Sequence, residues 1–242
     1  TLNKISPVGL AHLTESYILT DKTEDADAIL VRSQDMHEME FSEKLEAIAR
    51  AGAGVNNIPL DRCAKAGIVV FNTPGANANA VKELVLCGML LASRNVPAAL
   101  TWAKGLTEDV SKTVEKGKSQ FAGHEILGKT LGIVGLGAIG RKVAEAAKAL
   151  GMNIVGYDPY YVSGGEGLTV YPDLAEMLPL CDIVTLHLPA NDATKGMVNK
   201  EFLASMKDGA ILLNFSRDKL VNDVDLLVAL ESGKLTQYVT DF

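Results

Sequence analysis

The sequence predicts an α/β protein whose sheets are parallel and doubly wound. Apolar runs of strand length alternate along the chain with longer segments of helical period, and the runs show little polar alternation. Strands that are covered on both faces have this composition. Strand, helix and strand at this spacing form parallel pairs joined by right-handed crossovers, so helices are expected on both faces of each sheet.

Seven apolar runs are predicted strands, at residues 27–32, 67–72, 130–135, 153–158, 182–189, 210–215 and 235–242. Helices are expected at 42–50, 77–93, 138–150, 199–206 and 222–232. A polar stretch at 93–125 separates two strand-rich regions and is helical over much of its length. Such a segment is typical of a crossing between domains or of an oligomer interface. The predicted domains are therefore 1–93 and 94–242.

Composition excludes several classes of function. The chain has 242 residues, 48% of them hydrophobic, and a formal net charge of −7, so it lacks the basic surface that nucleic acid or anionic membrane requires. No apolar stretch approaches the length of a membrane span, and we expect a cytoplasmic protein. The three cysteines, Cys63, Cys87 and Cys181, form no CxxC pair. They indicate neither a disulfide framework nor a metal site, and we expect buried thiols.

The most specific motif is the stretch "TLGIVGLGAIGRKVAEAAKALGMNIVGYDP" at 130–159. Gly135, Gly137 and Gly140 form GxGxxG between a strand and a helix, and Asp158 ends the next strand. The glycines permit a tight turn, close approach of a pyrophosphate and close packing of helix on strand, while the start of the helix supplies N–H donors. Asp158 would accept hydrogen bonds from the adenosine ribose and repel a 2′-phosphate, which favours NAD over NADP.

The chain resembles the D-isomer-specific 2-hydroxyacid dehydrogenase family over nearly its whole length. The resemblance is carried by "DAILVRS" (27–33), "RAGAGVNNIPLDRCAKAGIVVFNTPGANANAVKEL" (50–84), residues 128–159, "CDIVTLHLPANDATKGMVNKE" (181–201) and "LLNFSRDKLVNDVDLLVAL" (212–230). It implies two Rossmann-like domains with the active site in the cleft between them. The first would be a flavodoxin-like substrate domain, incomplete here, and the second an NAD-binding domain truncated at its C-terminal end. It also implies a homodimer or higher homo-oligomer.

The family resemblance assigns further residues. Arg217 matches the arginine that holds the substrate carboxylate and polarises the carbonyl, although Asp218 stands where many relatives have glycine. His187 matches a strand-end position whose backbone passes the cofactor, and it is not the acid–base histidine. That histidine and its glutamate partner would follow Phe242, so the sequence is expected to be a fragment. The implied cofactor contacts also include Ala138, Ile139, Pro159, Leu188, Pro189, Phe215 and Asp241.

The substrate is indicated by residues of the first domain. Gly54 and Val55 lie in a glycine-rich loop whose N–H groups can hold a carboxylate. Arg32, Ser33 and Arg50 match positions that face a substrate phosphate in part of the family, and a guanidinium suits a dianion. Against this, Gln34-Asp35-Met36 stands where relatives often have another basic residue.

The expected reaction is thus NAD-dependent oxidation of 3-phospho-D-glycerate to 3-phosphohydroxypyruvate, the first step of serine biosynthesis. Two alternatives stay open. One is another family enzyme, such as a hydroxypyruvate/glyoxylate reductase or a D-lactate dehydrogenase. The other is a non-catalytic NAD-sensing corepressor of the same fold, which would expose an apolar peptide groove on the first domain.

Overall fold

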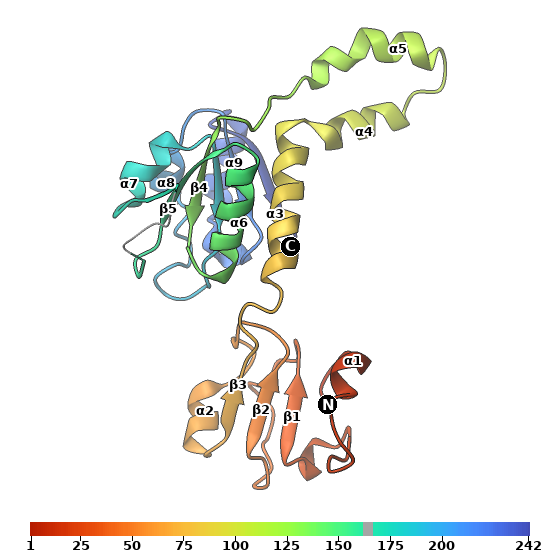
Figure 1. The fold of residues 1–242 in the computed structure, drawn as a ribbon, viewed down its shortest axis with the longest axis vertical. Coiled ribbons are helices and arrows are strands. Elements are labelled where there is room, and N and C mark those ends of the chain that lie inside the picture. The colour runs from red at the N-terminus through yellow and green to blue at the C-terminus, as the bar shows by residue number, and fades with distance from the viewer. Residues whose placement is uncertain (162–166) are drawn as a thin grey trace. The chain divides into compact units, whose positions relative to one another are not determined.

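The structure is a computed structural model that describes residues 1–161 and 167–242. The chain divides into two compact units, Thr1–Asn77 and Ala78–Phe242 (Figure 1). Each unit contains a parallel sheet with its own buried core, as the pattern of apolar runs predicts.

The first unit is built on three parallel strands in the order β1-β2-β3, which are Ala28–Val31, Ala47–Arg50 and Val69–Phe71. Short helical segments accompany them, namely α1 (Pro7–Leu10), η1 (Thr23–Asp25) and α2 (Leu60–Lys65). The core is small and gathers Ile29, Val31 and Ile48 from the strands with Cys63 from α2. Leu2 extends the sheet by an isolated parallel bridge to Val31.

The structure corrects one element of the sequence analysis. A helix is expected over 42–50, but residues 47–50 form β2, the central strand of the first sheet. The segment contains good helix formers, and its apolar residues Leu45 and Ala49 are four positions apart, which mimics a helical face. Pairing with β1 and β3 overrides that weak local preference and buries Ile48 completely.

The second unit contains a six-stranded parallel sheet in the order β6-β5-β4-β7-β8-β9. Its strands are β4 (Thr130–Val134), β5 (Asn153–Tyr157), β6 (Leu168–Val170), β7 (Ile183–Leu186), β8 (Ala210–Asn214) and β9 (Leu235–Thr240). Strand order reverses between β4 and β7. In open α/β sheets, ligands bind at the carboxyl ends of the strands beside such a switch point.

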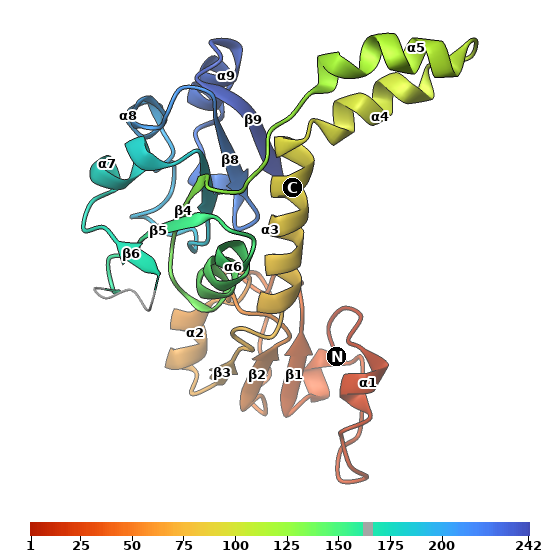
Figure 2. The ribbon, with the colours of Figure 1, turned by 45° about the horizontal axis from the view of Figure 1, so that its top comes forward.

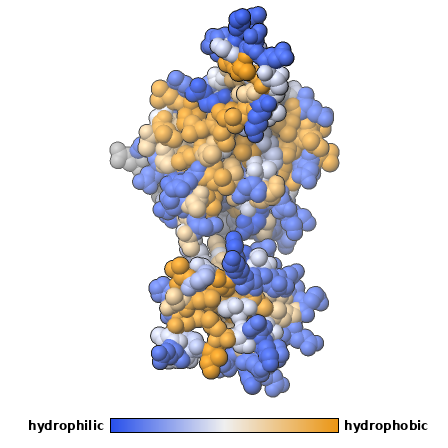
Figure 3. Space-filling model, turned by 90° about the vertical axis from the view of Figure 1, so that its right-hand side faces the viewer, coloured by the Kyte–Doolittle hydropathy of each residue, from blue (hydrophilic) through white to orange (hydrophobic). Residues whose placement is uncertain are grey.

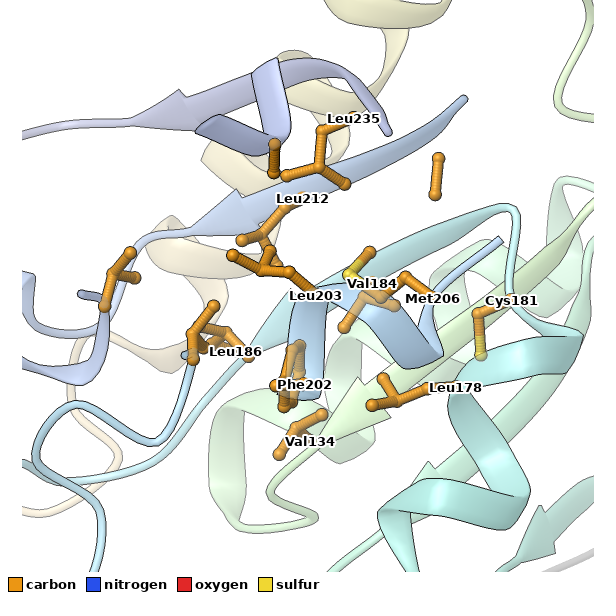
Figure 4. Packing of buried hydrophobic residues seen from close by; sticks show 14 of the residues in the cluster. Val134, Leu178, Cys181, Val184, Leu186, Phe202, Leu203, Met206, Leu212 and Leu235 are labelled. Carbon is orange, nitrogen blue, oxygen red and sulfur yellow. The ribbon is translucent and has the colours of Figure 1, made fainter. Parts of the chain in front are cut away.

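Helices cover both faces of this sheet (Figure 2). One face carries α3 (Ala78–Ser93) and α6 (Ala138–Ala149), and the other carries α7 (Leu174–Met177), η3 (Leu178–Leu180), α8 (Lys200–Ser205) and α9 (Asp223–Glu231). Figure 4 shows the second core, where Phe202 and Leu203 of α8 lie against Val184 and Leu186 of β7. The short η4 (Asp218–Leu220) joins β8 to α9.

The segment between the two strand-rich regions is helical, as predicted, and consists of α4 (Val96–Lys104), α5 (Val110–Gly117) and η2 (Lys118–Phe121). The preceding helix, α3, differs from its assignment in the sequence analysis, which places it in the first domain. Its residues Val85, Met89 and Ala92 are buried in the core that α6 and β4 share. Because α3 packs on the second sheet, the division between the units falls before it.

Within residues 1–161 and 167–242, no single helix has the length and apolarity to cross a membrane. Helices α3 and α4 taken together are long and apolar enough, but they are bent by 66° at the break between them. The expectation of buried thiols is confirmed for Cys63 and Cys181 and wrong for Cys87, which is exposed on α3.

Candidate functional site

The glycine motif forms the turn between β4 and α6, at the switch point of the second sheet. Gly135 has a φ of 101°, a backbone conformation that residues other than glycine rarely adopt. A Cβ on Gly140 would collide with the carbonyl oxygen of Gly135, so the third glycine is needed for close packing of the helix on the turn. By contrast, a Cβ on Gly137 would meet nothing within 4 Å. That open position is where a ligand can approach the backbone.

The start of α6 is left open to an anion. Gly137 is its N-cap residue and has no side chain with which to cap the helix, and no other side chain among the described residues caps it. The N–H groups at Ala138 and Ile139 therefore have no partner within the helix, and the helix dipole adds a partial positive charge at this end. A twelve-residue helix with free donors beside an open glycine fits the diphosphate of a dinucleotide.

Asp158 lies at the carboxyl end of β5 and is joined to the glycine turn. Its Oδ2 accepts a hydrogen bond from the Leu136 amide at 2.8 Å, and its Oδ1 accepts one from the Tyr160 amide at 2.9 Å. Each carboxylate oxygen has a further lone pair for a ribose hydroxyl. Pro159 and Tyr160 next to it are exposed and carry no positive charge. These residues fit NAD, and the 2′-phosphate of NADP would meet an uncompensated carboxylate.

The strand end at His187 faces the glycine turn across the switch point. Its backbone amide donates to the Val134 carbonyl at 2.8 Å, and a Cβ on Gly135 would come within 2.5 Å of the His187 carbonyl oxygen. Leu188 also lies against Gly135. The structure thus brings together the loops after β4 and β7, as expected for the two sides of a cofactor site.

The ring of His187 is unsuited to act as a base. Burial lowers the pKa of His187 from 6.5 to about 4, because a buried imidazolium loses its hydration. Nε2 lies 3.0 Å from Oγ1 of buried Thr185, and Nδ1 is buried with no hydrogen-bond partner within the described residues. Among the described residues no carboxylate forms a hydrogen bond with this ring, which agrees with the sequence analysis, where His187 is not the acid–base histidine.

Arg217 follows β8 and is exposed. Its Nη1 donates to the Ser216 carbonyl at 2.6 Å, and among the described residues it forms no ion pair, so the guanidinium can receive a carboxylate. Buried Asn214 holds its loop: Nδ2 donates to the Arg217 carbonyl at 2.8 Å, and Oδ1 accepts from the Ser216 amide at 3.1 Å. Sequence analysis missed Asn214. A polar residue that ends an otherwise apolar strand, just before the candidate arginine, is the signal that could have found it.

Two further predicted cofactor residues also lie at this edge. Phe215 is buried, and its ring lies where a Cβ on Gly88 would be, at 2.8 Å, so its side chain serves the core and leaves its backbone for a ligand. Asp241 is exposed directly after β9. The Gly loop, Asp158, His187, Arg217 and Asp241 thus all follow carboxyl ends of strands in one sheet.

In the first unit, Arg32 and Arg50 meet at the carboxyl ends of β1 and β2. Arg50 pairs with Val31 in the strand register, and its Nε donates to the Arg32 carbonyl at 3.0 Å. The Arg50 guanidinium also lies over Gly52, where a Cβ would come within 2.6 Å of Nη1. Arg32 itself is exposed, and no hydrogen bond or ion pair of its guanidinium occurs in the described part of the chain.

The loop after β2 presents free backbone donors. Its course is fixed by the amide of Thr73, which donates to the Gly52 carbonyl at 3.0 Å, and by Asn72 Nδ2, which donates to the Ala53 carbonyl at 2.7 Å. Within residues 1–161 and 167–242, the amides of Gly54 and Val55 donate to no protein acceptor. The predicted phosphate-side and carboxylate-side residues of this unit therefore gather at one sheet edge.

Comparison with known proteins assigns this architecture to a family. Residues 86–242 match the model of the D-isomer specific 2-hydroxyacid dehydrogenase NAD-binding domain. A D-3-phosphoglycerate dehydrogenase of Methanocaldococcus jannaschii is 38% identical over 248 aligned positions, which cover 99% of this chain and 45% of that protein. The chain belongs to the D-isomer-specific 2-hydroxyacid dehydrogenase family, and its second unit contains the family's NAD-binding domain.

Solved structures agree with this fold. A glyoxylate reductase from Paecilomyes thermophila matches with a TM-score of 0.77 at 30% identity, covering 90% of this chain and 67% of that one. An NAD-dependent formate dehydrogenase from Staphylococcus aureus, in complex with NAD, matches with a TM-score of 0.76 at 26% identity, covering 90% and 66%. The chain spans less than half the length of the curated relatives it matches.

Proposed function

We propose that this chain is the cofactor-binding and substrate-binding part of an NAD-dependent dehydrogenase that oxidises 3-phospho-D-glycerate to 3-phosphohydroxypyruvate, the first step of serine biosynthesis. The observation that carries the substrate is Arg32, which follows β1 and whose exposed guanidinium has no partner among the described residues. The loop after the neighbouring strand β2 contains the amides of Gly54 and Val55, which donate to no acceptor in the described part of the chain. One edge of the first sheet thus offers a cation for a phosphate and amides for a carboxylate. The name that the Methanocaldococcus relative carries agrees with this choice.

Each residue has a distinct task in the proposed reaction. Bound NAD supplies the acceptor for the hydride. The open start of α6 and Asp158 hold the cofactor, while Arg217 binds the substrate carboxylate and polarises the carbonyl that forms. Arg32 and Ser33 would hold the distal phosphate. The resemblance matches none of residues 1–242 to the family's acid–base histidine and glutamate, so binding is the appropriate measurement for this chain.

We also propose a homo-oligomer that forms through α3, α4 and α5. Neither α4 nor α5 has a buried residue, and Leu100 and Val110 on them are about half exposed. Figure 3 shows apolar side chains gathered over the side of the second unit along which α3 runs, where Leu84, Leu90 and Leu91 are exposed. A contiguous apolar surface of this kind favours association. Sedimentation of the purified chain would test it, and a monomer at micromolar concentration would contradict it.

The substrate proposal is tested by titrating the chain, saturated with NAD, with 3-phosphoglycerate and with D-glycerate. We expect tighter binding of 3-phosphoglycerate, and Arg32→Ala should weaken it about ten- to a hundredfold, because a charge-assisted contact is lost. Binding of D-glycerate should change less than twofold. Lys44→Ala removes another exposed cation of the first unit and serves as the matched control. Equal weakening of both ligands by Arg32→Ala would contradict a phosphate contact.

A further inference from the structure

The loop after β1, which carries Arg32 and Ser33, is fixed by a side chain from the start of the chain. Asn3 Oδ1 accepts hydrogen bonds from two consecutive amides, at 3.0 Å from Ser33 and 2.6 Å from Gln34. Asn3 has φ of 62°, a left-handed conformation that asparagine tolerates better than most residues. The neighbouring Leu2 amide donates to the Leu30 carbonyl at 2.8 Å, which fixes Asn3 beside the end of β1.

The same loop is held from its other side. Asn57 Nδ2 donates to the Gln34 carbonyl at 2.8 Å, so the backbone N–H and C=O of Gln34 are both engaged by asparagine side chains. The Met36 amide donates to the Asn57 carbonyl at 2.9 Å, and Arg50 Nε donates to the Arg32 carbonyl. The backbone from Arg32 to Met36 is therefore ordered by contacts within the protein, before any ligand arrives.

This arrangement decides which groups remain for an anion. Two successive N–H groups that point the same way form a concavity that binds anions, and here the Asn3 carboxamide oxygen occupies it. The amides of Ser33 and Gln34 are thus already engaged. The Arg32 guanidinium and the Ser33 hydroxyl stay unengaged within the described part of the chain. Recognition of an anion by the loop after β1 must then depend on these two side chains, and their placement depends on the loop that Asn3 holds.

We propose that Asn3 is a positioning residue of the phosphate subsite, which holds the Arg32–Ser33 loop in the conformation that receives the substrate phosphate. The inference rests on the proposed function. A preorganised loop lowers the entropy lost on binding, so the loss of its anchor weakens affinity without removing any group that touches the ligand. The effect is confined to phosphorylated ligands, because the carboxylate is held by other residues.

The test uses Asn3→Gly, which removes the side chain and tolerates the left-handed backbone. Hydrogen exchange of the Ser33 and Gln34 amides should accelerate at least tenfold, and the affinity for 3-phosphoglycerate should fall about three- to tenfold. The affinity for D-glycerate should change less than twofold. Asn222→Ala is the matched control, since Asn222 Oδ1 also accepts from two backbone amides, at 3.1 and 3.2 Å, but at the start of α9. This variant should change neither the exchange rates of the Ser33 and Gln34 amides nor the preference for 3-phosphoglycerate over D-glycerate.

A second variant, Asn3→Asp, keeps an acceptor for both amides and adds a negative charge at the amide of Ser33, the residue that follows Arg32. This variant should preserve the slow exchange of the two amides and still lower the affinity for 3-phosphoglycerate. It tests the inference even if Asn3→Gly unfolds the first unit. If Asn3→Asp left that affinity unchanged, or if Asn3→Gly accelerated exchange without weakening it, the inference would be overturned while the proposed function stood. If the parent chain bound 3-phosphoglycerate no better than D-glycerate, the phosphate preference itself would fail, and the inference with it.

Discussion

The Leu136 amide donates a hydrogen bond to Oδ2 of Asp158 at 2.8 Å, and this bond joins the glycine turn of β4 to the carboxyl end of β5. Asp158 therefore has two tasks. It fixes the glycine turn, and it presents a carboxylate that would accept hydrogen bonds from the ribose of bound NAD. Any change at this residue should affect both the order of the turn and the choice of cofactor.

Replacement of Asp158 by alanine should lower the affinity for NAD about ten- to a hundredfold, because charge-assisted hydrogen bonds are lost. NADP should lose less, or gain, because the repulsion of its 2′-phosphate disappears. The ratio of NAD to NADP affinity, measured by calorimetry, should therefore fall. Asp173→Ala is the control, since Asp173 caps α7 and lies outside the site. An unchanged ratio in Asp158→Ala would show that the carboxylate does not face the ribose.

Two glycines of the motif should respond differently to alanine. Gly137→Ala places its methyl group in open space, so the melting temperature should stay within about 2 °C of the parent value. The affinity for NAD should fall at least about tenfold, because the methyl group blocks the approach of the diphosphate. Gly140→Ala would collide with the Gly135 carbonyl, so the melting temperature should fall by several degrees. Thermal unfolding with and without NAD separates the two effects. Equal loss of stability in both variants would contradict an open position at Gly137.

Local sequence predicted the second unit well because its signals are local. All five strands predicted there occur, and the turn at Gly135 and the acidic residue Asp158 lie where the motif places them, while the three-residue edge strand β6 was not predicted. The reason is that each of these features depends on residues a few positions away. Strand β2 was mistaken for a helix because its four residues include good helix formers. Its strand conformation is decided by pairing with β1 and β3, which a local pattern does not show.

Of the residues that sequence analysis missed, Asn214 acts on residues two and three positions away, whereas Asn3 acts over a long distance in the chain. Asn3 accepts hydrogen bonds from amides thirty and thirty-one positions away. No spacing rule connects an asparagine near the start of a chain with a loop after the first strand.

The buried ring of His187 should make the second unit sensitive to acid. Its pKa is about 4 in the folded chain and near 6.5 when unfolded, so between these values the unfolded state binds more protons. The stabilisation is fully present above pH 6.5 and is lost as the pH falls toward 4, by about 3 kcal/mol in total. Urea unfolding from pH 7 to 4.5, followed by circular dichroism, should show a weaker pH dependence in His187→Gln. His12→Gln, at an exposed histidine, should keep the parent profile. Identical profiles for parent and His187→Gln would rule out this residue as the source.

Arg217 should contribute to the binding of every 2-hydroxy acid, because all of them share the carboxylate. Its guanidinium is exposed, its only described partner is the Ser216 carbonyl, and buried Asn214 fixes its loop. A bidentate contact between arginine and a carboxylate is charge-assisted, so Arg217→Ala should weaken both 3-phosphoglycerate and D-glycerate about ten- to a hundredfold in the presence of NAD.

The pattern across variants separates the two arginines. Arg217→Ala should weaken both ligands by the same factor, whereas Arg32→Ala should weaken only the phosphorylated one. Lys219→Ala removes a neighbouring exposed cation and should change neither affinity by more than about twofold, since a screened surface charge contributes little. Calorimetric titration of each variant with each ligand gives all the values needed. If Arg217→Ala weakened only 3-phosphoglycerate, Arg217 would belong to the phosphate subsite, because the carboxylate common to both ligands would then be held elsewhere.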